Sequence, residues 1–149
     1  MYHSPTSNRF FLWASFAALG AAAGFVRMAL RRRKAIAVLA RRELRSDAAF
    51  AALFPPPAGD IAVRLRAMLS RRLRIDLAGL LPSDRPSVEL HLDYAGHEAM
   101  QHFVTDVEGA FDISLPDCDR CAAMPFGDLV ARVAATVAKR ASPPRASRR

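Results

Sequence analysis

The sequence predicts an all-α protein, a small helical bundle that follows an N-terminal membrane-spanning helix. Three observations lead to this prediction. Residues 10–26 contain no charged side chain. Between residues 60 and 140, apolar residues recur at steps of three and four, the spacing of one face of a helix. Prolines at positions 55–57, 116 and 125 separate these periodic stretches, because proline cannot continue a helix.

Residues 10–30 form the predicted membrane span. Ser15 is the only clearly polar side chain in the uncharged run, and the long stem of Arg27 can carry its charge to the headgroups, so the run continues to Leu30. A helix of this length, at ~1.5 Å per residue, spans about 30 Å, the thickness of the hydrocarbon core of a bilayer.

The flanking charges predict the orientation of the span. Residues 31–34 are all basic, whereas Arg9 is the only basic residue in the N-terminal tail, residues 1–9. The positive-inside rule then places the C-terminal side in the cytoplasm. The expected location is therefore an inner (cytoplasmic) membrane, crossed once; the charges do not distinguish a bacterial from an organellar membrane. A mitochondrial presequence, a cleaved signal peptide and a buried soluble helix are the alternatives for this segment.

The next segments connect the span to a folded domain. Basic and apolar residues alternate over 31–54, which predicts a juxtamembrane helix, either on the membrane surface or as a solvated stalk. Residues 55–59, PPPAG, predict a stiff linker and a domain boundary. The tail 141–149 is basic, lacks apolar residues that could dock, and is expected to be disordered.

The domain is expected to comprise residues 60–140. Asp60 is a suitable N-cap for a first helix. The apolar stripe of that helix contains Ile61, Leu65, Met68, Leu69 and Leu73, and its other faces carry Arg64, Arg66, Arg71, Arg72 and Arg74. Residues 76–94 predict a long loop held by apolar contacts.

Two further helices and a short turn complete the bundle. The second helix begins near Gly96 and cannot continue through Pro116; its stripe contains Met100, Phe103, Val104, Val107, Ala110 and Phe111. Pro125 suits the first turn of the last helix. The stripe of the last helix contains Leu129, Val130, Val133 and Val137.

The charge distribution weakens a nucleic-acid function. The net charge is +7 over residues 1–59, −2 over 60–140 and +3 over the tail. A nucleic-acid-binding domain would need a basic face of its own. No nucleic-acid partner is therefore expected.

Two segments of the domain resemble acyl carrier proteins. The stretch VEGAFDISLPDCD (107–119) resembles the end of the second helix of a carrier protein, and MPFGDLVARV (124–133) resembles the entry to its fourth helix. The resemblance covers residues 60–140 and implies an acyl-carrier-like four-helix bundle with one short helix.

The resemblance also identifies a departure from the family at His97. Carrier proteins begin the second helix with an Asp-Ser-Leu motif whose serine carries phosphopantetheine. Here the aligned residues are Gly96, His97 and Glu98, and an imidazole cannot form that phosphodiester. The stretch GHEA (96–99) is similar to a group of uncharacterised acyl-carrier-like bacterial proteins that lack this serine. No phosphopantetheine or other cofactor is therefore expected.

What remains is an interaction surface without catalytic residues. In carriers the polar face of the second helix docks onto partner proteins. The resemblance therefore implies a protein-binding role for Glu98, Gln101, His102 and Asp106, in a non-catalytic, membrane-anchored adaptor that binds the membrane through residues 10–30 and their basic flank. The alternative is a working carrier modified at another residue, for which Ser114, Ser83 and Ser87 are poorly placed.

The pair Cys118 and Cys121 has the spacing of half a zinc site or of a redox dithiol. A structural zinc would need two further ligands, and the histidines of the domain are His91, His97 and His102. His97 and His102 are about 140° apart around a helix, and no βαβ pattern surrounds the cysteines. A zinc or thiol-redox protein is thus a further alternative, and no metal site is expected.

Overall fold

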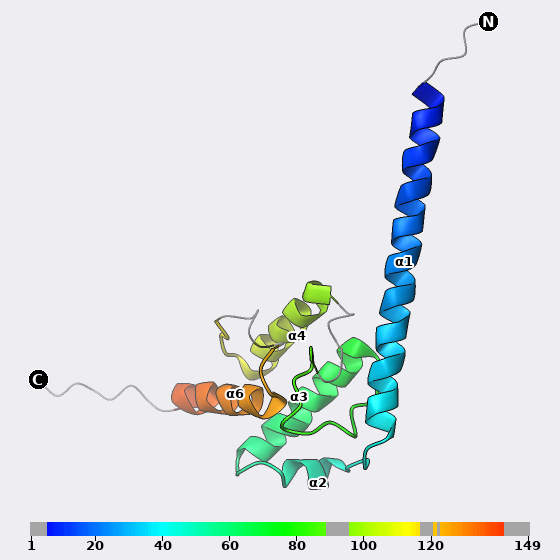
Figure 1. Ribbon diagram of the computed structural model, residues 1–149. Helices are drawn as coiled ribbons and strands as arrows, with labels where there is room; N and C mark the ends of the chain where they lie inside the picture. Colours follow the sequence, from blue (N-terminus) through cyan, green and yellow to red (C-terminus); the bar gives the residue numbers. More distant parts are fainter. Residues whose placement is uncertain (1–5, 89–95, 117–120, 122, 142–149) are drawn as a thin grey trace, which may run out of the picture.

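The computed structural model describes residues 6–88, 96–116, 121 and 123–141, with side chains described from residue 20 in the first helix and from residue 99 in the helix that begins at Gly96. Within these ranges the chain is all-helical, as predicted. The helices are α1 (Thr6–Ala40), α2 (Asp47–Ala51), α3 (Ala58–Leu73), α4 (Gly96–Phe111) and α6 (Phe126–Ala141). Figure 1 shows α1 as a long rod that extends well beyond a cluster formed by the other four helices.

The helix α1 contains the whole of the predicted span. Where the structure describes its residues, no helix has the length and the apolar character needed to cross a bilayer. The transmembrane part of the predicted fold class is therefore not supported. The side chains of residues 10–19, half of the predicted span, lie outside the described residues.

The prediction of one juxtamembrane helix over 31–54 is wrong. Helix α1 ends at Ala40, residues 41–46 are non-helical, and α2 begins at Asp47. The reason is a cap within the segment, because the side chain of Ser46 accepts a hydrogen bond from the Ala49 amide at 3.2 Å. A serine in this position satisfies an amide that no helix carbonyl can reach.

The apolar stripe of α3 lies in the core as predicted. The N-cap of the helix and the burial of Arg66 differ from the prediction. Leu65, Leu69 and Leu73 are buried. However, α3 begins at Ala58 with Pro57 as its N-cap residue, so Asp60 lies within the first turn and is not the cap. Its carboxylate there still interacts favourably with the positive end of the helix. Arg66, which was expected on a solvent-exposed face, is buried.

Helices α4 and α6 supply the remaining core side chains. Phe103, Val104 and Val107 of α4 are buried, whereas Ala110 is exposed, contrary to prediction. Helix α4 ends at Phe111, ahead of Pro116, and Asp112 then adopts a left-handed conformation with φ 52°. Helix α6 follows Pro125 directly, and its buried residues are Phe126, Leu129, Val130 and Val133.

The loop between α3 and α4 is held by apolar contacts in its described part, as predicted. Ile75, Leu77 and Leu80 are buried in the core. Its backbone also fixes the start of α6, because the carbonyls of Asp84 and Pro82 each accept a hydrogen bond at 2.7 Å, from the amides of Phe126 and Gly127. Residues 89–94 of the predicted loop lie outside the described residues.

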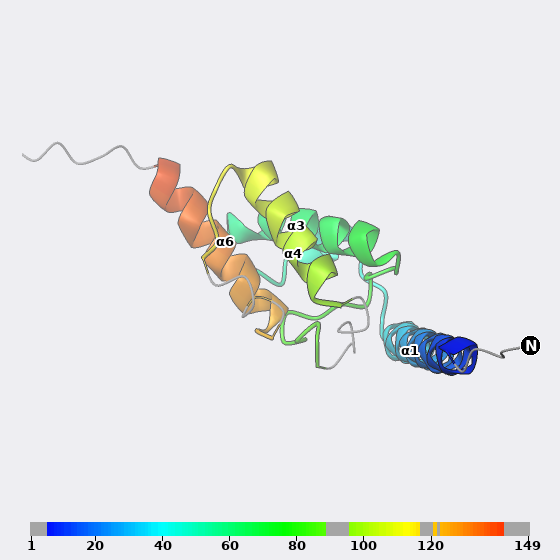
Figure 2. The ribbon, with the colours of Figure 1, turned by 90° about the horizontal axis from the view of Figure 1, so that it is seen from above.

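The core extends to both sides of the proline-rich segment 55–59. Ala35 and Leu39 of α1 and Phe50 of α2 are buried together with the core residues of α3, α4 and α6. Figure 2, seen along α1, shows the other helices lying on one side of it. The last turns of α1 are therefore part of the helical domain, and the rest of α1 projects away from it.

Candidate interaction surface

An exposed polar stripe runs along α4, on the face opposite its buried phenylalanine and valines. Gln101, His102, Thr105 and Asp106 are all exposed, at the helical spacing expected for one face. The Thr105 hydroxyl donates to the Gln101 carbonyl at 3.0 Å, one turn back. Three of the four residues predicted to bind a partner therefore lie together at the surface, and we call Gln101, His102, Thr105 and Asp106 the α4 stripe.

Asp106 also has a partner within the chain. Its Oδ2 forms an ion pair with Nη2 of Arg72 on α3, and both side chains are partly exposed. This contact joins α3 to α4 at the edge of the α4 stripe. The resemblance that singled out Asp106 contained no signal for this pairing, because it depends on how two helices distant in sequence pack together.

A shallow groove lies between the surfaces of α3 and α4, beside the α4 stripe. It encloses about 690 Å³ and is lined on the α3 side by Met68, Arg71, Arg72 and Arg74. On the α4 side it is lined by Thr105, Asp106, Gly109 and Ala110. Three arginines against one carboxylate make the groove basic, which the near-neutral charge of the domain as a whole does not reveal.

The position that the resemblance aligns with the carrier serine lies in the first turn of α4. Gly96 begins the helix, so His97 and Glu98 occupy its first positions. Their side chains, and residues 89–95 before them, lie outside the described residues. The role predicted for Glu98 therefore stays a prediction, as does the replacement of the carrier serine by His97.

The other reactive residues are placed as follows. Cys121 is buried, with 1% of its surface exposed, and Cys118 lies outside the described residues. No cluster of three or more histidine, cysteine, aspartate or glutamate side chains suitable for a metal occurs in the described ranges. Ser83 and Ser114 are exposed, and Ser87 is half-buried.

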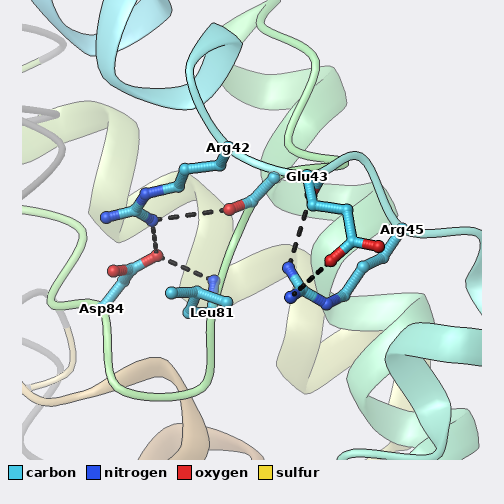
Figure 3. Close-up of polar contacts among 6 residues, drawn as sticks. Arg42, Glu43, Arg45, Leu81 and Asp84 are labelled. Carbon is cyan, nitrogen blue, oxygen red and sulfur yellow. Dashed lines mark hydrogen bonds and ion pairs between the residues drawn. The ribbon is translucent and has the colours of Figure 1, made fainter.

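Two further ion pairs connect segments of the domain to one another. The sequence pattern indicated neither of them. Nη1 of Arg42 lies 2.5 Å from Oδ2 of Asp84, and the same oxygen accepts a hydrogen bond from the Leu81 amide at 2.8 Å (Figure 3). Nη2 of Arg66 lies 2.5 Å from Oδ1 of Asp47. The first pair ties the segment after α1 to the loop before α4, and the second ties α3 to α2.

Arg66 also stacks on an aromatic ring. Its guanidinium carbon lies 4.1 Å from the centroid of Phe50, and Nη1 donates to the Arg45 carbonyl at 3.3 Å. An arginine can be buried here because the ring, the carboxylate and the carbonyl together replace its water shell. The sequence signal that was available is the Ser46-Asp47 helix start, which places Phe50 one turn into α2.

Comparison with known proteins adds no family assignment. No protein-family description, no curated protein and no solved structure matches this chain.

Proposed function

We propose that the protein is a non-catalytic, membrane-anchored adaptor with an acyl-carrier-like helical domain that binds a partner protein through the α4 stripe. The domain lies on the cytoplasmic face of a bacterial inner membrane, and it carries no phosphopantetheine. The observation that carries this proposal is the α4 stripe itself, a continuous polar face next to a basic groove.

The apolar surface of α1 supports the membrane anchor. Every residue from Gly20 to Leu30 is exposed. The large side chains among them include Phe25, Val26 and Leu30, with 69%, 56% and 53% of their surfaces exposed. A contiguous apolar surface of this kind needs a covering, and a bilayer supplies one. The basic residues 31–34 follow immediately, which favours the cytoplasmic orientation of the domain.

The absence of a serine at the start of α4 supports a binding role without a prosthetic group. His97 stands in the first turn of a helix that begins at Gly96, where the resemblance expects the modified serine. Without a serine at this position, we infer that the domain acts through its surface. We therefore expect an unchanged intact mass when the full chain is co-produced with a phosphopantetheinyl transferase, and an added phosphopantetheine would refute this part of the proposal.

Site-specific photocrosslinking in intact membranes tests the partner surface. A photoreactive residue is placed singly at Gln101, His102 or Thr105 of the α4 stripe. The matched controls are Ala131 and Ala135, which are exposed on α6. We expect the three α4 positions to give one common crosslinked protein and the two α6 positions to give none. Equal crosslinking from both helices, or none from α4, would argue against the α4 stripe as the binding face.

The anchor is tested separately. Leu19→Arg places a charge in the middle of the predicted span, and an arginine at the centre of an inserted helix costs about 2.5–3.5 kcal/mol. Leu44→Arg is the control, because Leu44 is exposed beyond the end of α1. Under alkaline washing of membranes, we expect the wild type and Leu44→Arg to stay in the pellet and Leu19→Arg to be partly released. Complete release of the wild type would exclude a membrane-spanning helix.

A further inference from the structure

Basic side chains from two distant parts of the sequence meet where α1 leaves the domain. Helix α1 contributes Arg31, Arg32, Arg33 and Lys34, and the C-terminal end of α3 contributes Arg71 and Arg74. We call these six residues the basic surface. All are exposed except Arg31, which is half-buried.

A direct contact joins the two parts of the basic surface. Nη2 of Arg32 donates a hydrogen bond to the Arg74 carbonyl at 3.1 Å. Arg74 therefore lies close to Arg32, and it also lines a hollow with Ile36, Leu39 and Ala40 in the following turns of α1. Arg32 is two residues, about 3 Å of helix, beyond the end of the predicted span. The headgroup layer is about 5–8 Å thick on each side of the hydrocarbon core, so Arg32 falls within its depth and Arg74, bonded to Arg32, lies next to this layer.

The domain is fixed in this position relative to α1. Ala35 and Leu39 of α1 are buried in the domain core. A Cβ on Gly79 would lie only 2.9 Å from the Leu39 carbonyl oxygen, so the loop after α3 packs directly against α1. The Arg45 amide also donates to the Ala78 carbonyl at 3.0 Å. The end of α3 therefore stays next to residues 31–34, as Figure 1 shows.

The two arginines that the end of α3 adds to the basic surface, Arg71 and Arg74, keep most of their charge uncompensated within the described part of the chain. Arg72, between the two arginines of α3, pairs with Asp106. Neither Arg71 nor Arg74 forms an ion pair with a described residue. Asp76 lines the same hollow as Arg74 and offsets one charge. This excess of positive charge next to the headgroups favours the binding of anionic groups.

We propose that the basic surface binds anionic lipid headgroups, so that the end of α3 contacts the membrane surface. This inference rests on the membrane anchor proposed above. Its new content is that α3, and not only the flank of the span, contacts lipid. Lipid phosphates are the expected occupant because they lie at the depth of these residues, where an acidic protein would have to displace them.

Arginine footprinting of the full-length protein tests this contact. The protein is reconstituted into phosphatidylcholine vesicles with or without phosphatidylglycerol and treated with the arginine reagent phenylglyoxal, and modification is quantified by mass spectrometry. Each basic residue near an anionic surface gains roughly fivefold in binding. We therefore expect Arg71 and Arg74 to react about fivefold more slowly when phosphatidylglycerol is present. Raising the salt concentration should abolish the difference, because it screens exposed charges. Arg140, at the far end of α6, is the internal control and should not change.

The outcomes separate the inference from the anchor. Equal reactivity of Arg71 and Arg74 in both vesicles, with the protein still resistant to alkaline washing, would overturn the lipid contact and leave the anchor intact. Protection that does not depend on phosphatidylglycerol would also overturn it. Loss of the protein from the vesicles on washing would overturn both proposals.

A pair of charge-reversal variants gives a second measurement. In Arg71→Glu/Arg74→Glu, we expect Arg72 to react at the same rate in both vesicles, because two carboxylates at the end of α3 repel anionic headgroups from its surroundings. The control Lys139→Glu/Arg140→Glu makes the same change in net charge on α6, and Arg72 should remain protected by phosphatidylglycerol. The same lipid dependence of Arg72 in both variants would refute the inference.

Discussion

Asp84 connects three parts of the domain through one buried side chain and its backbone, and its ion pair with Arg42 is the central contact. The carboxylate binds Arg42, next to the end of α1, and accepts the Leu81 amide of its own loop. The Asp84 carbonyl accepts the amide of Phe126, the first residue of α6. The orientation of α1 relative to the bundle therefore depends on this residue.

Removing the Asp84 carboxylate should destabilise the domain strongly. Its side chain is 4% exposed, and Asp84→Ala leaves both Arg42 and the Leu81 amide without this acceptor. We expect a loss of about 3 kcal/mol in the free energy of unfolding. The control is Glu43→Ala, because Glu43 pairs with Arg45 at 3.4 Å but its side chain is 81% exposed. An exposed pair contributes little, so its loss should stay under about 0.5 kcal/mol. Urea unfolding of the detergent-solubilised full chain, followed by circular dichroism, measures both; equal losses would contradict this account.

The two arginines that stack on phenylalanines should respond differently to lysine. Arg66 lies over Phe50 and is buried, whereas Arg64 lies over Phe111 at 4.2 Å and is exposed. Lysine keeps the charge but cannot stack or form a planar fork of hydrogen bonds. We expect Arg66→Lys to cost about 2 kcal/mol and Arg64→Lys about 0.5 kcal/mol in urea unfolding. A smaller loss of unfolding free energy for Arg66→Lys than for Arg64→Lys would show that burial does not strengthen the contact of Arg66 with Phe50.

Alanine should have opposite effects at two glycines. At Gly79 a new Cβ would meet the Leu39 carbonyl oxygen at 2.9 Å, so the contact between α1 and the loop would have to open. At Gly109, an exposed position inside α4, nothing lies within 4 Å. We expect Gly79→Ala to lower the free energy of unfolding by about 1–3 kcal/mol. Gly109→Ala should raise it by about 1 kcal/mol, because alanine is the better helix former. Thermal unfolding of the two variants in parallel provides the measurement, and a stabilised Gly79→Ala would mean that α1 does not pack closely here.

The periodic parts of the fold were predictable from sequence. The stripes containing Leu65, Phe103 and Val130 are buried because helical spacing places apolar residues on one face, and the prolines bound the helices. In the α4 stripe, Gln101, His102 and Asp106 were predicted from the resemblance to carrier proteins, and all three lie outside the apolar stripe of that helix. The exposure of these residues follows once the buried face of α4 is known, and it needs no other knowledge of the tertiary structure.

Contacts between segments distant in sequence were not predictable in this way. Arg66 was expected on a face away from the apolar stripe, and its burial depends on Asp47, 19 residues away, together with the Phe50 ring and the Arg45 carbonyl. The break between α1 and α2 was hidden because the basic and apolar residues of 31–54 fit one continuous helix. The groove beside the α4 stripe was missed because its arginines belong to α3.

The left-handed C-cap of α3 gives the last prediction. Arg74 has φ 53° and ψ 44°, a conformation that a glycine adopts without strain and a branched or long side chain adopts at a cost of roughly 1–2 kcal/mol. Arg74→Gly should therefore raise the free energy of unfolding by about 1 kcal/mol in detergent, where no lipid headgroup binds the guanidinium.

Asp112 ends α4 with nearly the same φ of 52°, but aspartate tolerates this region better. Asp112→Gly also loses an exposed ion pair with Arg140, so its gain should be smaller. The carbonyl that accepts from Arg32 is kept in Arg74→Gly, so this bond does not affect the comparison. If unfolding in detergent shows no gain for Arg74→Gly, the left-handed conformation of Arg74 is not a source of strain and this account is refuted.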